Sequence, residues 1–197
     1  MAGHKYEAEK AGHLEGRLRR FLAPPNALLS RFVPLPGEIW AEVGAGTGFF
    51  AIPLAARVEK VHALDLNEKM LALLRRNLAE KQVQNIEAVK SDESTLPLPD
   101  SSVDAVLLAF VLHEVDEPER FLAEVARITR TGGRLCVIEF TASGMFGPPQ
   151  DERLTSQQIN DLAAGASFES SRAWSWQRRL LGWKYFGLAG IEYRKLL

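Results

Sequence analysis

Glu42-Val43-Gly44-Ala45-Gly46-Thr47-Gly48 is the stretch of sequence that decides the fold. It follows the short apolar run of residues 39–43 and precedes a segment with helical character at residues 50–57. Glycines between a strand and a helix allow positive φ angles and let the backbone approach a ligand closely. The N-terminus of the following helix presents free N–H groups and a partial positive charge. The stretch therefore predicts a binding loop for a polar ligand group.

Strands and helices alternate outward from this loop. The predicted strands are residues 39–43, 60–66, 86–89, 103–110 and 134–140, and the predicted helices are residues 50–57, 68–81 and 118–128. Residues 103–110 are nearly all apolar, as in a strand buried on both faces. Gly132-Gly133 is expected to close the last of these helices. The alternation predicts an α/β fold, with a doubly wound, mostly parallel sheet and helices on both faces.

The two ends of the chain depart from this alternation. Residues 1–36 have helical periodicity broken at Pro24-Pro25, which predicts a helical cap on a core of residues 37–140. The last segments are predicted as a loop, a helix and two strands, at residues 141–153, 155–164, 168–177 and 185–197. The connection between these two strands is too short for a parallel crossover, so we expect an antiparallel C-terminal hairpin. The length fits a single domain of residues 1–197.

Composition excludes several classes of protein. With 46% hydrophobic and 25% charged residues, the chain is typical of a soluble globular protein. No apolar run is long enough to span a bilayer and no signal peptide is evident, so no membrane partner is expected. Cys136 is the one cysteine, which excludes an internal disulfide and a Cys-based zinc site and favours a reduced, cytoplasmic compartment; no metal site is expected. The net charge of −1 disfavours a nucleic-acid partner.

Three features indicate the ligand. The third glycine of a dinucleotide fingerprint would fall at Phe49, which disfavours NAD or FAD and favours a cofactor without a pyrophosphate. Asp65 ends the second strand, where a carboxylate can accept hydrogen bonds from both hydroxyls of a ribose. The alternative for Asp65 is a cap for the helix that follows, a role that Asn67 could also fill. Asp92 follows the third strand, where an acidic side chain can accept from the amine of adenine.

Five stretches, in order and at family spacing, resemble the class I S-adenosylmethionine-dependent methyltransferases. Within this family, the chain is similar to the small methyltransferase-domain group that includes the ubiquinone and menaquinone biosynthesis C-methyltransferases. The stretches are residues 42–48, 61–71, 91–99, 104–115 and 121–133. The resemblance covers roughly residues 37–140 and implies a Rossmann-like, seven-stranded sheet whose last strand is antiparallel.

The resemblance also implies S-adenosyl-L-methionine as the cofactor and a role for each matching residue. The methionine part would be held by the backbone of Gly44, Ala45 and Gly46, the ribose by Asp65, and the adenine by Leu66, Asp92 and the backbone of Glu93, while Ala109 and Phe110 would lie near the amino-acid end. His113 would face the substrate pocket.

A general base is needed only if the methyl acceptor must lose a proton, because transfer from a sulfonium otherwise depends on alignment and exclusion of water. The candidates past the fourth strand are His113, Glu114 and Asp116, of which His113 has the best-suited intrinsic pKa. The alternative for His113 is a capping or packing residue before the helix at Pro118. Glu139, at the end of the fifth strand, is a further candidate for the site or for a surface role.

The expected function is methyl transfer from S-adenosylmethionine to a small or medium-sized organic substrate. The alternatives are a protein or RNA methyltransferase that uses the basic ends of the chain, and a non-catalytic cofactor-binding scaffold. Leu108-Ala109-Phe110-Val111 replaces the Asp/Asn-Pro-Pro-aromatic motif, which argues against methylation of a nucleobase amine. The N-terminal segment, with Tyr6, Lys10 and Arg17, is expected to be either a lid over the pocket or a helix covering one edge of the sheet.

Overall fold

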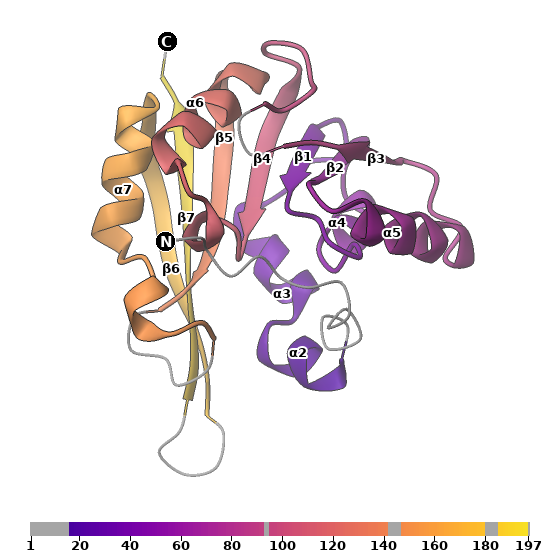
Figure 1. Ribbon diagram of the computed structural model, residues 1–197, viewed down its shortest axis with the longest axis horizontal. Helices are drawn as coiled ribbons and strands as arrows, with labels where there is room; N and C mark the ends of the chain where they lie inside the picture. The colour runs from indigo at the N-terminus through magenta and orange to yellow at the C-terminus, as the bar shows by residue number, and fades with distance from the viewer. Residues whose placement is uncertain (1–15, 93–94, 142–146, 180–184, 197) are drawn as a thin grey trace.

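The computed structural model describes residues 16–92, 95–141, 147–179 and 185–196. Its centre is a seven-stranded sheet with the strand order β3-β2-β1-β4-β5-β7-β6 (Figure 1). The strands are β1 (Ile39–Val43), β2 (Lys60–Asp65), β3 (Ile86–Lys90), β4 (Val103–Ala109), β5 (Thr129–Phe140), β6 (Phe168–Arg179) and β7 (Tyr185–Lys195). β1 to β5 are parallel, and β7 is antiparallel to both β5 and β6. This is the expected fold class, including the C-terminal hairpin.

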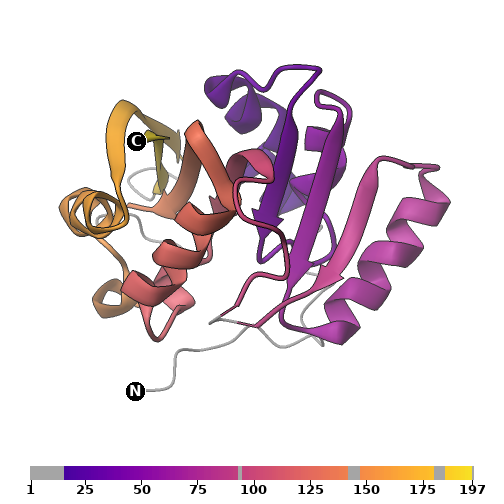
Figure 2. The ribbon, with the colours of Figure 1, turned by 90° about the horizontal axis from the view of Figure 1, so that it is seen from above.

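Helices cover both faces of the sheet. They are α2 (Arg17–Leu22), α3 (Pro25–Leu29), α4 (Ala51–Ala55), α5 (Glu68–Glu80), α6 (Pro118–Ile128) and α7 (Ser156–Gly165), with short 3-10 turns η2 (Ser30–Phe32), η3 (Leu112–Glu114) and η4 (Gln150–Glu152). One buried cluster joins α3, α4 and α5 to one face, and a second joins α6 and α7 to the other. Figure 2 shows α6 and α7 side by side. The apolar positions of α3 to α7 therefore face the sheet.

The N-terminal helices confirm the expected break at the prolines. α2 ends at Leu22, and α3 begins at Pro25, where a proline is tolerated because the first helical N–H has no partner. Leu22, Leu28 and Phe32 are buried in the core. Tyr6 and Lys10 belong to the segment expected to be either a lid or a helix covering one edge of the sheet, and they lie outside the described residues.

The start of β5 corrects one expectation. α6 ends at Ile128 and β5 begins at Thr129, before the glycines that were expected to close the helix. Instead the register of β4 and β5 shifts between Val103 and Ala105, with Gly132 at a φ of 73°. Gly132-Gly133 therefore belongs to an irregular part of the strand, where glycine accommodates a bulge.

Residues at the carboxyl ends of the parallel strands form one edge of the sheet, which we call the carboxyl rim. In open α/β sheets, ligands bind at this rim. Among the residues that the structure describes, no helix is both long enough and apolar enough to cross a bilayer.

Candidate functional site

The glycine loop after β1 is hydrogen-bonded to the end of β2 at Gly44 and Ala45, and it borders open space at Gly46. The N–H groups of Gly44 and Ala45 both donate to the carbonyl of Leu64, at 2.8 and 2.9 Å. Gly44 has a φ of 74°, and a Cβ atom there would lie 2.4 Å from a methyl group of Val111. Gly46 has a φ of 54°, but a Cβ atom there would have nothing within 4 Å. The backbone at Gly46 thus borders open space, as a loop that holds a ligand requires.

Asp65 lies against this loop. Its Oδ2 accepts from the N–H of Gly46 at 2.8 Å, and its Oδ1 accepts from the N–H of Asn67 at 2.7 Å. Asn67 itself caps α5 by accepting from the N–H of Lys69, so capping is not the role of Asp65. Burial raises the pKa of Asp65, while its two backbone hydrogen bonds lower it. Each carboxylate oxygen has a further lone pair for a ligand hydroxyl.

The neighbouring strand ends provide an apolar surface and an acid. Leu66 is 42% exposed, which is high for an apolar residue directly after a buried strand. Asp92 is exposed beyond β3, and its Oδ1 accepts from the N–H of Thr95 at 2.7 Å. Glu93 lies outside the described residues. Leu66 and Asp92 are therefore both accessible at the end of the rim where adenine is expected.

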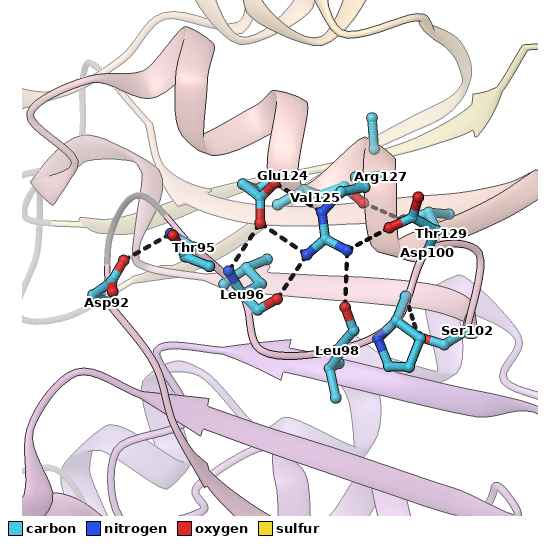
Figure 3. Close-up of polar contacts among 12 residues, drawn as sticks. Asp92, Thr95, Leu96, Leu98, Asp100, Ser102, Glu124, Val125, Arg127 and Thr129 are labelled. Atoms are coloured by element: carbon cyan, nitrogen blue, oxygen red, sulfur yellow. Dashed lines mark hydrogen bonds and ion pairs between the residues drawn. The ribbon is translucent and has the colours of Figure 1, made fainter.

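Arg127 of α6 holds residues 96–100 of the loop that follows Asp92 by hydrogen bonds (Figure 3). Its guanidinium donates to the carbonyls of Leu96 and Leu98, at 2.7 and 2.9 Å, and to the carboxylate of Asp100 at 2.7 Å. Glu124 completes the arrangement, because it accepts from Arg127 and from the N–H of Leu96 at 3.0 Å. A planar guanidinium with several fixed acceptors restrains a loop more firmly than one hydrogen bond can.

Glu42 and Arg19 lie beside the glycine loop and the aromatic rings of the candidate site, although no role was assigned to either from the sequence. Glu42 is buried in β1, and its Oε2 has no hydrogen-bond partner among the described residues. Burial raises the pKa of Glu42 well above its ordinary value; Arg19 opposes this rise and Asp65 adds to it. The guanidinium of Arg19, on α2, lies 4.2 Å from the ring centre of Phe49 and 5.7 Å from that of Phe110. A carboxylate in the apolar strand of residues 39–43 was a usable sequence signal, whereas the position of Arg19 depends on tertiary packing.

An aromatic cluster continues the site past β4. Ala109 ends this strand with only 8% of its surface exposed. Phe110 has a φ of 62°, a conformation that costs a residue of its size on the order of 1–3 kcal/mol. Its ring centre lies 4.7 Å from that of Phe140 and 6.0 Å from that of Phe50. Such strain is concentrated at functional sites, where the surroundings hold the side chain in place.

His113 and Glu139 form a buried pair beside this cluster. Nδ1 of His113 lies 2.8 Å from Oε2 of Glu139, with the two side chains 7% and 3% exposed. The other oxygen of Glu139 accepts from the N–H of Leu112 at 2.9 Å, so the carboxylate is fixed on both sides. The imidazole is edge-on to Phe140, with the ring centres 5.8 Å apart. The sequence suggested His113 and Glu139 only as separate candidates, and the structure brings their side chains into contact.

The charges around His113 set its protonation. Burial alone would lower its pKa, but the hydrogen bond and charge of Glu139, with smaller contributions from Glu114 and Glu152, raise it above the ordinary value. Nε2 of His113 lies 3.9 Å from Glu114, whose own pKa is raised by burial. A carboxylate that accepts from Nδ1–H leaves Nε2 as the proton acceptor of the neutral ring.

Asp116, another candidate from the sequence, and Cys136, which the sequence did not favour as a nucleophile, have different surroundings. Asp116 is exposed in the segment between η3 and α6. Cys136 is fully buried within β5, and burial raises the pKa of its thiol, so it is no nucleophile. Within the described parts of the chain, no three His, Cys, Asp or Glu side chains are placed to hold a metal ion.

Comparison with known proteins identifies the family. A family model described as a methyltransferase domain matches residues 41–137. The chain is 33% identical over 179 residues to a demethylmenaquinone methyltransferase of Clavibacter sepedonicus, a match that spans 83% of this chain and 70% of that protein. This chain belongs to the class I S-adenosylmethionine-dependent methyltransferases.

A second relative and one solved structure agree with this assignment. A demethylmenaquinone methyltransferase of Renibacterium salmoninarum is 34% identical over 173 residues, covering 82% of this chain and 71% of that protein. The crystal structure of a SAM dependent methyltransferase from Aquifex aeolicus superposes with a TM-score of 0.85 at 27% identity, and the match covers 98% of this chain and 100% of that one. The expected enzyme class, cofactor and methyl transfer to a small or medium-sized organic acceptor are thereby confirmed.

The site of this methyltransferase fits S-adenosylmethionine. The open space at Gly46 and the unfilled lone pairs of Asp65 lie next to each other, and the exposed Leu66 follows directly in the chain. Oε2 of Glu42, which has no hydrogen-bond partner within the described parts of the chain, adds a buried polar atom in β1 just before the same loop. Several carboxylates at one rim also favour a cofactor that carries a positive sulfonium.

Proposed function

We propose that this methyltransferase methylates a carbon atom of a small aromatic acceptor with ionisable hydroxyl groups, of the quinol type, and that His113 is its general base. The observation that carries the proposal is the buried hydrogen bond between His113 and Glu139 beside the rings of Phe110 and Phe140. Aromatic side chains provide an apolar surface for a flat ring, and the imidazole provides a base at its edge.

Each residue of the cofactor site has a distinct role in this proposal. Asp65 binds the ribose hydroxyls, the backbone from Gly44 to Gly46 supports the methionine part, and Arg19 neutralises the carboxylate of that part. Leu66 packs on the adenine ring, whose amine donates to Asp92. The bound cofactor supplies a methyl group activated by the positive sulfur.

The acceptor loses one proton for each methyl group that it gains, and His113 takes it. Glu139 accepts from Nδ1–H and so holds the ring in the tautomer whose Nε2 is free to accept. The same carboxylate stabilises the imidazolium that results, as the acid does in other acid–histidine pairs. Glu114, beside Nε2, then offers a path for the proton to solvent.

The relatives' names support a quinol-type acceptor. Two of the most similar relatives are demethylmenaquinone methyltransferases, and another, from Methylobacterium nodulans, is a ubiquinone/menaquinone biosynthesis C-methyltransferase. A reduced, cytoplasmic location agrees with the single buried Cys136. The one continuous sheet supports a single domain over residues 1–197. The near-neutral charge favours a small-molecule partner over a nucleic acid.

The experiment is incubation of the purified full chain with carbon-13-methyl S-adenosylmethionine and a water-soluble hydroquinone, followed by NMR of the product. We expect a methyl signal at the shift of a ring-attached carbon. A signal at the shift of a methoxy group would contradict carbon methylation, and no transfer to any hydroquinone would contradict the acceptor class. Calorimetry with S-adenosylhomocysteine shows in either case whether the cofactor site is intact.

A further inference from the structure

The outer face of α2 combines exposed apolar and cationic side chains. Leu18 is 63% exposed and Phe21 is 53% exposed, and they lie three residues apart on one side of the helix. Arg17 and Arg20 of the same helix are also exposed, although the guanidinium of Arg20 lies 5.5 Å from the ring centre of Phe49. Arg178 of β6 joins this face, because its guanidinium lies 5.3 Å from the ring centre of Phe21. We call these five residues the α2 face.

Nothing in α2 offsets the charge of this face. The helix contains no acidic residue, and the ion pairs of the described residues include none made by Arg17, Arg20 or Arg178. The helix is nevertheless firmly placed. Leu22 is buried in the core, and its carbonyl accepts from the indole N–H of Trp176 at 2.8 Å. The apolar side chains are thus held outward by a helix whose other side is anchored.

The α2 face adjoins the methyl-transfer site. The guanidinium groups of Arg19 and Arg20 both lie over the ring of Phe49, and that of Arg19 also lies near the ring of Phe110. In Figure 1, α2 lies at the lower end of the molecule, toward which β4 points. One short helix therefore separates the aromatic cluster of the site from an exposed cationic and apolar surface.

We propose that the α2 face docks on an anionic lipid bilayer and that the apolar acceptor reaches the site from that bilayer. The proposal rests on the proposed function for its second part only. Arginines beside exposed apolar side chains suit a surface of anionic headgroups over acyl chains. Leu18, at 63% the most exposed large apolar residue in the part of the chain that the structure describes, can neither stack on a base nor form a hydrogen bond, which favours lipid over nucleic acid. No membrane partner was expected from the sequence because no segment can span a bilayer, but docking needs surface contact alone.

The first test is sedimentation of the full chain with vesicles of phosphatidylcholine, with and without phosphatidylglycerol. We expect binding to the anionic vesicles that weakens with salt, and roughly tenfold weaker binding by the double variants L18S/F21S and R17Q/R20Q. The matched control is V33S/L35S, which changes two other exposed apolar residues, 52% and 53% exposed, and should bind like the wild type. Equal binding to both kinds of vesicle, or full binding by L18S/F21S, would overturn the proposal.

The second test separates docking from catalysis. We expect L18S/F21S to keep wild-type turnover of a water-soluble hydroquinone and to lose roughly tenfold in turnover of a long-chain hydroquinone dissolved in anionic vesicles. Vesicle binding without turnover of either acceptor would refute the proposed function and leave the docking surface standing. If the wild type self-associates and L18S/F21S does not, the α2 face binds another copy of the chain, and docking on lipid is refuted. If the wild type binds polyuridylate more tightly than anionic vesicles, the face binds RNA, and docking on lipid is likewise refuted.

Discussion

The carboxyl rim has two halves that are constructed in different ways. In the cofactor half, Asp65 and the glycine loop are joined by hydrogen bonds to backbone N–H groups, between segments close together in the chain. In the acceptor half, His113 of η3, after β4, and Glu139 of β5 are joined side chain to side chain. The first half depends on backbone geometry, which a short motif encodes, and the second depends on tertiary packing. Substitutions should therefore affect binding in one half and the chemical step in the other.

The largest effect is expected from His113→Asn. Asparagine can still donate to Glu139 but cannot accept the proton, so kcat should fall on the order of 1000-fold with S-adenosylhomocysteine affinity unchanged. In the wild type, activity should rise with pH, because the base must be neutral and its pKa lies above the ordinary value of 6.5. The rise should therefore be centred above that value, and a pH profile of kcat/KM measures it.

Glu139→Gln tests the cause of this pKa. Without the charge of Glu139, burial is the main remaining influence, so the pKa of His113 should fall and the acid limb of the profile should move to lower pH. NMR titration of the imidazole measures the shift directly. Glu152→Gln, which removes a weaker neighbouring charge, is the control. An unchanged limb in Glu139→Gln would show that His113 is not the group that titrates.

The second largest effect is expected from Asp65→Asn. The amide loses the charge and must turn its NH2 group toward the N–H of either Gly46 or Asn67, so affinity for S-adenosylhomocysteine should fall on the order of 100-fold. Calorimetry with the 2′-deoxy analogue of S-adenosylhomocysteine tests the contact with the ribose. The wild type should bind S-adenosylhomocysteine more tightly than this analogue, and Asp65→Asn should bind the two equally. Glu68→Gln, at an exposed ion pair on α5, should leave both affinities unchanged.

The same contrast explains how much could be predicted from the sequence. The roles of Gly44 and Asp65 and the alternation of strands and helices follow from local patterns, because a glycine loop and a strand-end acid need only a strand and a helix around them. Arg19 could not be predicted, because its role requires α2 to pack on Phe49 and Phe110, far away in the sequence. The pairing of His113 with Glu139 was equally invisible, since it depends on the register of β4 against β5.

Gly44 and Gly46 belong to the same loop, but substitutions at the two positions should have different effects. Gly44→Ala should destabilise the fold by about 2–3 kcal/mol, because the new Cβ meets Val111 at 2.4 Å in a backbone with a positive φ. Gly46→Ala should cost only about 1 kcal/mol, since its Cβ points into open space, but should weaken cofactor binding more. Urea unfolding and calorimetry measure the two quantities. Combining Gly44→Ala with Val111→Ala should restore the part of the unfolding free energy that is lost to the clash with Val111. A double variant no more stable than Gly44→Ala would show that this clash is not the cause of the loss.

The smallest effect is expected from Arg127→Ala. We expect no contact between this guanidinium and the cofactor. It positions the loop after Asp92 through its hydrogen bonds to Leu96, Leu98 and Asp100 (Figure 3). A loosened loop should raise the KM for S-adenosylmethionine by roughly tenfold and leave kcat nearly unchanged. Arg120→Ala is the control, because Arg120 lies on the same helix in an exposed pair with Glu117.

A role in adenine recognition can be separated from a general loss of stability. S-inosylhomocysteine lacks the adenine amine, so the wild type should bind it less well than S-adenosylhomocysteine. If Arg127 positions Asp92 for that amine, Arg127→Ala should reduce this preference, and adding Asp92→Asn should reduce it little further. An undiminished preference in Arg127→Ala, together with a lower midpoint of urea unfolding, would mean that Arg127 supports the fold and not the recognition of adenine.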